Sequence, residues 1–232
     1  MDLSGKSIVV TGAFGILGAA VVAGARSAGA QVACIDVAPV SKAPVACEGC
    51  VLLGEVDLAS VSATHAALAL AAVRLGVLDG LVNVAGGFRW EPLAEGALAT
   101  WDLMFNINVR TAVNATRAAL PRLKAPGGRI VNIGAAAASK AAAGMGPYAA
   151  AKAGVVKLTE ALAEELKESG VAVNAVLPSI IDTPVNRTEM PSADFTRWVK
   201  PEQVADLIVF LLSERAAAIT GAAIPISGRV QG

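Results

Sequence analysis

Short runs of β-branched and aliphatic residues alternate along this chain with longer, alanine-rich stretches in which apolar residues recur at helical spacing. The short runs predict seven strands, which we place at Ser7–Thr11, Gln31–Asp36, Val51–Val56, Gly80–Asn83, Arg129–Ile133, Val171–Leu177 and Ala223–Ile226. The longer stretches predict helices at Gly15–Ala28, Ser60–Leu75, Thr100–Leu123, Tyr148–Glu168 and Pro201–Leu212. Their alternation predicts one α/β domain over residues 1–232, in which a seven-stranded parallel sheet is doubly wound with helices on both faces. Ligands of such sheets bind at the carboxyl ends of the strands.

Two segments show neither the apolar runs of the strands nor the helical spacing of apolar residues. Val37–Cys50 contains Pro39, Pro44 and Gly49, so we expect a loop there in place of a full crossover helix. Asp182–Lys200 contains two prolines and follows the sixth predicted strand, which places it over the ligand end of the sheet. We interpret residues 182–200 as a lid over the substrate.

The 19 basic and 19 acidic side chains are interspersed along the chain, so nucleic acid is not an expected partner. One stretch, Ser7–Ala25, carries no charge and is long enough to suggest a membrane span or a signal peptide. Its glycines at positions 12, 15 and 18 favour a strand, a turn and a buried helix instead. We therefore expect a cytoplasmic protein with no membrane partner.

Three cysteines raise the possibility of a metal or redox site, because the spacing Cys47-x-x-Cys50 is shared by zinc sites and redox-active pairs. A zinc site needs about four ligands. The only other candidates are Cys34, inside a predicted strand, and His65, which lies in a helical stretch where a surface position is expected. We favour ordinary free thiols in a reducing compartment and predict no metal.

A glycine-rich turn joins the first predicted strand to the first predicted helix. Glycines at these positions permit a tight turn, close approach of a pyrophosphate, and close packing of the helix on the sheet, while the helix N-terminus faces the phosphates. A tight strand-to-helix turn without a ligand is the alternative. We assign contact with a dinucleotide to Gly12, Phe14, Gly15, Ile16 and Gly18.

Three later strand ends extend this expected cofactor site. Asp36 ends the second strand, where a carboxylate accepts hydrogen bonds from ribose hydroxyls and repels a 2′-phosphate, so we expect NAD, as NADH, rather than NADPH. A solvated strand end is the alternative for Asp36. After the third strand we place Asp57 and Leu58 beside the adenine, with a helix N-cap as the alternative for Asp57. After the fourth strand, small residues let the backbone approach the ribose, and the residues we assign there are Asn83, Ala85 and Gly86.

Tyr148 and Lys152 are spaced i, i+4, so they share one face of a predicted helix. An ammonium group beside a phenol favours the phenolate and lowers the pKa of the phenol. A phenol tuned in this way is a suitable proton donor for a substrate that receives hydride from a nicotinamide. The pair and the glycine-rich turn together predict a hydride-transfer enzyme.

Together these residues resemble the short-chain dehydrogenase/reductase family over nearly the whole chain. The resemblance rests on the glycine motif, Asp57, Asn83–Gly86, Asn108, Tyr148 with Lys152, Asn174, Pro178 and Thr183. It implies a Rossmann fold, with Tyr148 as acid and base and Lys152 holding the nicotinamide ribose. It also implies that Asn108 anchors a proton-relay water and that Thr183, with Pro178 and Ile181 nearby, meets the carboxamide. Related enzymes pair through two helices, here Thr100–Leu123 and Tyr148–Glu168, so we expect a homodimer or homotetramer.

Two departures from the common pattern bear on the substrate. Ile16 stands where the common branch has a glycine, and Ala135 stands where the family has a serine that donates a hydrogen bond to the developing alkoxide. Ser139 lies too close to Tyr148 in sequence to take the place of the missing serine. Losing one such donor typically costs ~10²–10³ in rate. The substrate is therefore either a poorly reduced ketone or a molecule that spreads the incoming charge.

Quinonoid dihydropteridine reductases, a branch of the family, also lack that serine, and this chain resembles them. The resemblance rests on the glycine spacing, on Val84–Gly87, on the stretch before Tyr148 and on Asp182–Trp198, which includes Asn186. It implies that a conjugated ring occupies a site near Ala135 and Asn186. Phe88 and Trp90 either stack on that ring or only line the lid.

Three functions are consistent with these observations. The first is an NADH-dependent reductase of the dihydropteridine type, acting on a small molecule. The second is an alcohol, ketone or 3-oxoacyl dehydrogenase in which another group replaces the serine. The third is a non-catalytic NAD-binding regulator, which Tyr148 and Lys152 disfavour because a protein that only binds needs no acid.

Overall fold

The computed structural model of the protein, which describes residues 1–230, contains one sheet of seven parallel strands. Their order in the sheet is β3-β2-β1-β4-β5-β6-β7. The strands are β1 (Ser7–Thr11), β2 (Gln31–Ile35), β3 (Val51–Leu53), β4 (Gly80–Asn83), β5 (Arg129–Ile133), β6 (Ala172–Pro178) and β7 (Ala223–Ile226). This confirms the doubly wound fold that the alternation of strands and helices predicts.

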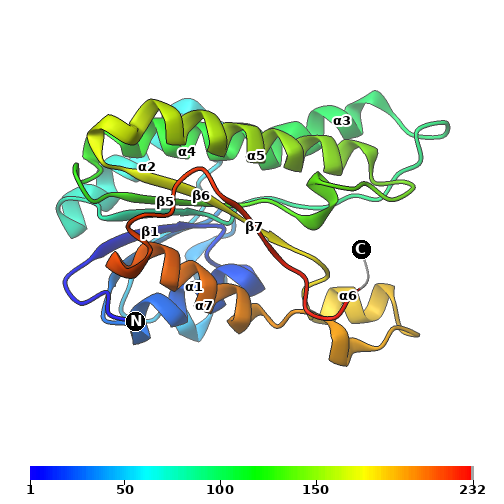
Figure 1. Ribbon diagram of the computed structural model, residues 1–232, viewed down its shortest axis with the longest axis horizontal. Coiled ribbons are helices and arrows are strands. Elements are labelled where there is room, and N and C mark those ends of the chain that lie inside the picture. The colour runs from blue at the N-terminus through cyan, green and yellow to red at the C-terminus, as the bar shows by residue number, and fades with distance from the viewer. Residues whose placement is uncertain (231–232) are drawn as a thin grey trace.

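Helices cover both faces of the sheet, as Figure 1 shows. On one face lie α2 (Val61–Leu75), α4 (Thr111–Ala119) and α5 (Gly146–Leu166). On the other face lie α1 (Ile16–Ser27) and α7 (Pro201–Leu212). Two shorter helices, α3 (Leu98–Phe105) and α6 (Pro184–Glu189), project beyond the end of the sheet on opposite sides.

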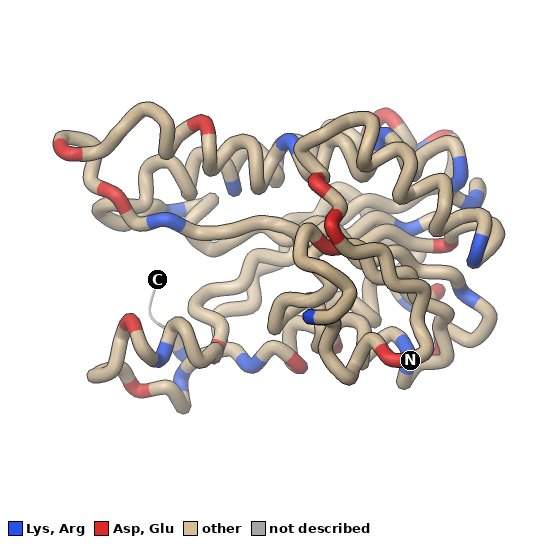
Figure 2. The backbone as a smooth tube through the Cα atoms, turned by 180° about the vertical axis from the view of Figure 1, so that it is seen from behind, with Lys and Arg blue, Asp and Glu red and all other residues tan. Residues whose placement is uncertain are grey.

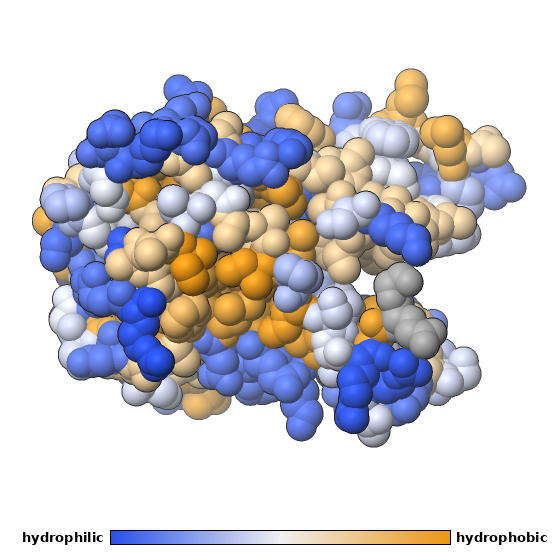
Figure 3. Space-filling view, in the orientation of Figure 1, coloured by the Kyte–Doolittle hydropathy of each residue, from blue (hydrophilic) through white to orange (hydrophobic). Residues whose placement is uncertain are grey.

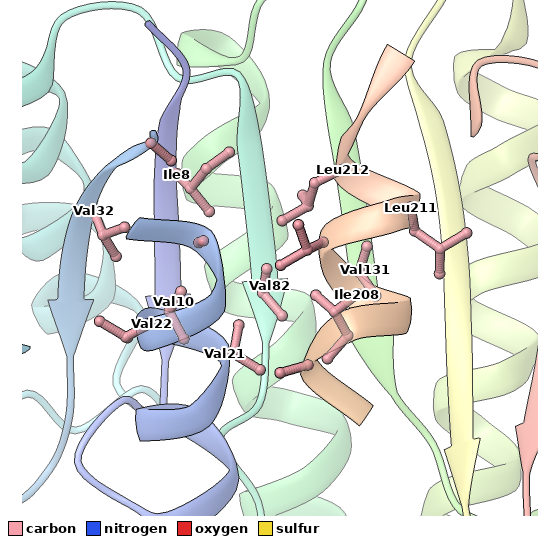
Figure 4. Packing of buried hydrophobic residues seen from close by; sticks show 14 of the residues in the cluster. Ile8, Val10, Val21, Val22, Val32, Val82, Val131, Ile208, Leu211 and Leu212 are labelled. Atoms are coloured by element: carbon pink, nitrogen blue, oxygen red, sulfur yellow. The ribbon is translucent and has the colours of Figure 1, made fainter. Parts of the chain in front are cut away.

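Aliphatic side chains of the central strands pack against α1 and α7 (Figure 4). Val10 and Val82 lie on adjacent strands and meet Val21 of α1 and Ile208 of α7, and all four side chains are fully buried. The opposite face has its own core, formed against α2, α4 and α5. Because parallel strands are buried on both faces, they read in the sequence as continuous apolar runs.

Several predicted boundaries need correction. Strand β3 ends at Leu53 instead of Val56, because Gly54 follows and Glu55 adopts a positive φ of 58° that no strand continues. The region predicted as the helix Thr100–Leu123 begins at Leu98 and contains a π-helical turn, η3 (Asn106–Arg110), between α3 and α4. The α-helical part of this region ends at Ala119, four residues before Leu123, and the 3₁₀ turn η4 (Leu120–Arg122) follows it. The remaining changes at strand and helix ends are of one or two residues.

The two irregular segments differ in structure. Val37–Cys50 contains only two 3₁₀ turns, η1 (Val40–Lys42) and η2 (Val45–Cys47), so the predicted loop in place of a crossover helix is confirmed. The segment 182–200 is not a simple loop, because it contains α6 and a 3₁₀ turn, η7 (Phe195–Arg197). Its role as a lid remains a prediction.

Charged residues of both signs are scattered over the chain, with no long run of one sign (Figure 2). In the part of the chain that the structure describes, no helix is both long and apolar enough to cross a membrane. The uncharged stretch from Ser7 forms β1, the turn and most of α1.

Candidate active site

The carboxyl ends of β1 and β4 define the centre of the candidate site, because the strand order reverses between them. From β1 the chain goes to β2 and β3 on one side, and then returns to β4 on the other. Loops that leave neighbouring strands in opposite directions open a crevice at this point, where nucleotides bind in doubly wound sheets. The predicted site residues follow β1, β2, β3, β4, β5 and β6 at this end, or lie on the helices nearby.

The glycine-rich turn has the backbone geometry that a dinucleotide cradle needs. Gly12 has a positive φ of 63°, and a Cβ there would lie 2.7 Å from the backbone nitrogen of Ala85. A Cβ on Gly18 would collide with the carbonyl oxygen of Gly12, so α1 packs tightly on the turn. Gly15 and Ile16 are exposed, and no side chain caps the first turn of α1. The free N–H groups at this helix start fit a pyrophosphate group.

Asp36 is buried at the end of β2 and is tied to the glycine-rich turn. Its Oδ2 accepts a hydrogen bond from the backbone N–H of Phe14 at 2.9 Å, and its Oδ1 accepts one from Ala38 at 2.9 Å. An ionised carboxylate has about four acceptor positions. Asp36 therefore retains acceptor capacity for two ribose hydroxyls, and the fixed orientation brings its negative charge to the cradle.

In the loop after β3, the side chains of Asp57 and Leu58 are not bonded to the glycine-rich turn as Asp36 is. Asp57 is exposed and accepts a hydrogen bond from the N–H of Ala59 at 2.9 Å, whereas the N-cap of α2 is Ser60. The N-cap alternative for Asp57 is therefore wrong. The side chain of Leu58 is buried in the core, so only its backbone is available to a cofactor.

Asn114 of α4 holds that loop in place, and the sequence reasoning did not identify it. Its buried Nδ2 donates to the carbonyl oxygens of Leu58 at 3.0 Å and Ala59 at 3.1 Å. The contact joins residues 56 positions apart in the chain, so no local pattern marks it. Asn114 is thus a positioning residue for the loop expected beside the adenine.

Asn83, assigned to the ribose site, points its side chain into the protein instead. Its Nδ2 donates to Asn132 Oδ1 at 2.8 Å and to Thr116 Oγ1 at 3.1 Å, and Asn132 donates in turn to Thr159 Oγ1 at 2.9 Å. These four side chains are fully buried and join β4 and β5 to α4 and α5. Only the backbone at Asn83, with partly exposed Ala85 beyond it, faces the site.

Tyr148 and Lys152 lie on one face of α5, as their spacing predicts, with Lys152 Nζ 5.9 Å from the centre of the phenol ring. Lys152 is fully buried, and its Nζ donates to the carbonyl oxygen of Ile133 at 2.8 Å. Burial lowers the pKa of Lys152 to about 8. An ammonium group with a lowered pKa gives up its proton more easily, so its protonation responds to a change of charge at the reacting atoms.

The pKa of Tyr148 is shifted opposite to our expectation. Burial raises the pKa of this phenol to about 12, because the phenolate would lose its hydration. Lys152 does not offset this effect, since its ammonium group is held at the carbonyl of Ile133. Tyr148 is consequently protonated at neutral pH and available as a proton donor.

Asn108 lies in the π-helical turn η3 and connects the loop after β4 to the helices. Its Oδ1 accepts from the N–H of Gly87 at 3.2 Å, and its Nδ2 donates to the carbonyl of Gly87 at 3.1 Å and to that of Met104 at 3.0 Å. A Cβ on Gly86 would lie 2.5 Å from Asn108 Oδ1 and 3.4 Å from Lys152 Nζ. Gly86 therefore lets the loop pack against both groups. π-Helical turns of this kind are frequent at functional sites.

Ala135 is 5% exposed and follows β5 in extended backbone conformation. It is two residues beyond Ile133, whose carbonyl holds Lys152, so it lies close in the chain to the group that fixes the lysine. Ser139 is exposed at the end of the following 3₁₀ turn. No hydrogen bond between the Ser139 hydroxyl and Tyr148 is present among the described residues.

Two aromatic residues lie at the opening of the site. Phe88 is 47% exposed and packs edge-on against Tyr148, with ring centres 4.9 Å apart and planes at 88°. Trp90 is 59% exposed, donates from its indole N–H to the carbonyl of Ala143 at 3.0 Å, and lies against Gly144. Phe88 thus borders the reacting phenol, whereas Trp90 fastens the loop after β4 to the loop before α5.

The segment after β6 closes on itself beside the site. Thr183 caps α6, since its Oγ1 accepts from the N–H of Asn186 at 3.2 Å, and Asn186 Nδ2 donates to the carbonyl of Ile181 at 2.7 Å. Asn186, assigned tentatively to the substrate, therefore stabilises the turn that carries Ile181 and Thr183. Pro178 ends β6 and is buried.

Known proteins are similar to this chain in sequence and fold over most of its length. The family model described as short chain dehydrogenase matches residues 6–193. The chain is 35% identical over 249 aligned positions to the 3-oxoacyl-(acyl-carrier-protein) reductase FabG of Pseudomonas aeruginosa, with 98% of each chain covered. A short-chain dehydrogenase/reductase from Serratia marcescens superposes with a TM-score of 0.91 at 32% identity, with 98% of each chain covered. A short chain dehydrogenase from Burkholderia cenocepacia, solved in complex with NADP, superposes with a TM-score of 0.88 at 31% identity, again with 98% of each chain covered.

The cradle, the buried lysine and the protonated phenol, found together in a chain with these relatives, define an NAD(P)-dependent oxidoreductase. The chain belongs to the short-chain dehydrogenase family. None of the three relatives carries the name of a dihydropteridine reductase, so the likeness to that branch is not supported by them.

Proposed function

We propose that the protein is an NADH-preferring oxidoreductase that interconverts a small carbonyl compound and the corresponding alcohol. The position of the Tyr148 phenol, partly buried and protonated beside Lys152 at the cofactor crevice, carries this proposal. The substrate class rests on the FabG relative, whose name describes reduction of a 3-oxoacyl group. The non-catalytic alternative is disfavoured, because a binding protein has no need of a buried acid and a buried lysine.

When bound, the nicotinamide supplies or accepts the hydride. In reduction, the Tyr148 hydroxyl donates its proton to the substrate atom that becomes negative. Lys152, fixed by the carbonyl of Ile133 with its Nζ 5.9 Å from the centre of the phenol ring, holds the nicotinamide ribose beside the acid. Phe88 covers one edge of the phenol and limits the access of water to it. In the reverse direction the phenolate acts as the base, and the high pKa of Tyr148 makes that form scarce at neutral pH.

Ala135 favours a second substrate class, in which a conjugated ring such as a quinonoid dihydropterin accepts the hydride. A methyl group at this position supplies no hydrogen bond to an alkoxide, and a ring that spreads negative charge has less need of one. Phe88 presents a partly exposed aromatic surface next to Tyr148, which suits a flat ring. This proposal keeps the same acid, the same lysine and the same cofactor.

Steady-state oxidation of NADH separates these possibilities. The purified protein is assayed with a panel of ketones and 3-oxoacyl thioesters and, separately, with quinonoid dihydropterin. Turnover of ketones or thioesters supports the first class, and turnover of the pterin alone supports the second. Tight NADH binding without turnover of any member of either set would support the regulator instead.

We predict that Asp36→Ala lowers kcat/KM for NADH and raises it for NADPH, so that the ratio of the two falls by roughly tenfold or more. The carboxylate loses its hydrogen bonds to the ribose, and a 2′-phosphate no longer meets a buried negative charge. Steady-state kinetics with both cofactors measures the ratio. A wild-type protein that prefers NADPH would contradict the assignment.

Asp36→Asn is the matched control for this experiment. Its amide oxygen can still accept the hydrogen bond from Phe14, so the glycine-rich turn keeps its anchor while the charge is removed. If repulsion sets the preference, NADPH use rises in both variants. If only Asp36→Ala changes the kinetics, and it does so for both cofactors equally, the carboxylate acts solely as a structural anchor.

We also propose that the protein forms a homodimer or homotetramer. Part of the small-residue stripe of α5 packs within the chain, since Ala149 and Ala151 are buried and Gly154 faces Val109. Large apolar side chains remain exposed nearby on α3, including Leu103 and Phe105. Figure 3 shows a second apolar area over β7, an edge strand paired only with β6. Light scattering at micromolar concentration should give a multiple of the chain mass, and a monomer would exclude the assembly.

A further inference from the structure

Three cysteine thiols meet on the α1 face of the sheet, although they are separate in the sequence. Cys34 lies in β2, Cys47 ends the 3₁₀ turn η2, and Cys50 directly precedes β3. The three side chains pack in one apolar cluster, and the thiol of Cys34 interacts with both other thiols. All three are free, and Cys34 and Cys47 are fully buried, whereas Cys50 is partly exposed. Among residues 1–230, no group of side chains has the arrangement of a metal site. The cluster is therefore an unpaired set of adjacent thiols.

Cys50 is the member that solvent reaches, because it borders a cavity of about 470 Å³ at the amino ends of β2 and β3. The cavity lies at the opposite end of the strands from the cofactor crevice. Arg26 of α1 and Arg74 of α2 both line it. The guanidinium group of Arg26 is held there by a 3.0 Å hydrogen bond to the carbonyl of Ala46. Glu48, on the same loop as Cys50, is exposed and does not line the cavity.

The surroundings divide the three thiols into one reactive and two protected members. The hydrogen bond from Cys34, together with the charge of Arg26 and against the effect of burial, lowers the pKa of Cys50 to about 7. The same hydrogen bond, with burial, raises the pKa of Cys34. Burial also raises the pKa of Cys47, whose thiol lies 3.7 Å from the carbonyl oxygen of Ala13. Since the thiolate is the nucleophilic form, reaction begins at Cys50.

We propose that Cys50 is a modification site for small anionic disulfides, with Cys34 as the thiol that resolves the adduct. The Cys50 thiolate attacks one sulfur of the disulfide RSSR, forms Cys50–S–S–R, and releases one thiolate RS⁻. Cys34 then loses its proton to solvent, attacks the sulfur of Cys50, and releases a second RS⁻. The net reaction oxidises two protein thiols to one disulfide, reduces RSSR to two thiols, and is balanced in electrons and protons.

The location of Cys34 suits the second step. Cys34 pairs in register with Leu52, so Cys50, two residues earlier on the adjacent chain, projects from the same face of the sheet. Once Cys50 is part of a mixed disulfide, it is no longer a thiolate that holds the proton of Cys34 in a hydrogen bond. Cys34 thus becomes the better nucleophile only after Cys50 has reacted.

The two arginine side chains determine which disulfides enter. A disulfide that bears carboxylates is attracted to guanidinium groups in a concave site, whereas one that bears ammonium groups is repelled. Oxidised glutathione has the first character and cystamine has the second. We therefore expect the protein to react faster with oxidised glutathione than a free model thiol of similar pKa does, and more slowly with cystamine.

The test exposes the whole protein to oxidised glutathione or to cystamine and follows each cysteine by mass spectrometry of peptides. In the wild type, Cys50 is modified first and a Cys34–Cys50 disulfide replaces the adduct. Cys34→Ser should retain glutathione on Cys50, and Cys50→Ser should leave Cys34 and Cys47 unmodified. Adducts that form first on Cys47 in the wild type, or that form on Cys34 and Cys47 in Cys50→Ser, would overturn the proposal.

The double variant Arg26→Gln with Arg74→Gln tests the anion preference. The rate with oxidised glutathione should fall by roughly tenfold relative to the rate with cystamine, and added salt should reduce the wild-type preference in the same direction. NADH binding by the double variant measures whether it is folded, because neither Arg26 nor Arg74 lies at the cofactor crevice. If wild-type protein that binds NADH normally reacted equally fast with both disulfides, the arginine-lined cavity would not select anionic disulfides.

Discussion

Tyr148→Phe should reduce kcat by roughly 10²–10⁴-fold and leave NADH binding nearly unchanged. The substitution removes only the hydroxyl, so the ring can still pack edge-on against Phe88, and Lys152 retains its bond to the carbonyl of Ile133. The loss therefore reports proton transfer alone. Turnover is measured with the best substrate of the panel, and cofactor affinity by fluorescence titration with NADH. Wild-type turnover in this variant would remove the phenol from the mechanism.

The same residue offers a direct measurement of its ionisation, because Tyr148 is the only tyrosine of the chain. Ultraviolet absorbance of the phenolate should appear near pH 12 in the free protein and be absent from Tyr148→Phe. Because burial raises the pKa, the neutral phenol persists through neutral pH and the proton donor for reduction is present there. Oxidation of an alcohol needs the phenolate. Its rate should therefore rise as the pH approaches 12, whereas the rate of reduction, which uses the neutral phenol, should not rise there.

Ala135→Ser should raise kcat for ketones by roughly tenfold or more, because the new hydroxyl can donate a hydrogen bond to the alkoxide as it forms. For a quinonoid pterin the same change should be neutral or harmful, since a buried hydroxyl without a partner destabilises the site. Ala135 is almost fully buried, so the hydroxyl has little access to water. The measurement is kcat with both substrate types, for wild type and variant.

Ala135→Gly provides the matched control, because it changes the side chain without adding a donor. A gain for ketones in the serine variant alone would assign the effect to the hydrogen bond. A large gain for pterin reduction in the serine variant would contradict the view that a charge-spreading substrate needs no such donor. A gain in both variants would show that room, and not hydrogen bonding, limits the reaction.

Much of the fold can be predicted from the sequence because each strand of a parallel sheet is an apolar run buried on both faces. The strands β1, β4, β5 and β7 have the predicted boundaries, and so does α7. The segment 182–200 is harder to predict. Its prolines suggested an irregular loop, yet Thr183 followed by Pro184 is the N-cap and first residue of α6, a known helix start.

The π-helical turn could not be foreseen, because it adds one residue to a turn within a long amphipathic stretch. Over so short a distance the apolar spacing of α3 and α4 is still that of a continuous helix. The reason for the turn lies far away in the sequence, in the paired hydrogen bonds between Asn108 and Gly87. The family resemblance identifies Asn108 as a site residue but not the contact that holds it.

The electrostatics of the site were the least accessible to sequence reasoning. The spacing of Tyr148 and Lys152 correctly placed both on one face of α5 but did not reveal that Lys152 is fully buried. The same applies to Asn83, which looked like a cofactor ligand and instead donates to Asn132 and Thr116. In each case the decisive partner comes from another element, so burial and direction follow only from the tertiary structure.

The two ends of the segment 182–200 are bonded to each other: the N–H of Val199 donates to the carbonyl of Ile180, and the N–H of Asp182 donates to the carbonyl of Val199. The cost of closing this loop is thus met at its base and depends only weakly on its length. We therefore expect changes of length between these ends to have little effect on β6 or α7, as long as buried Trp198 and the bonds between Arg197 and Arg229 are kept. We therefore expect that exchange of residues 187–196, which leaves Thr183 and Asn186 in place, changes substrate choice and preserves the residues of the cofactor crevice.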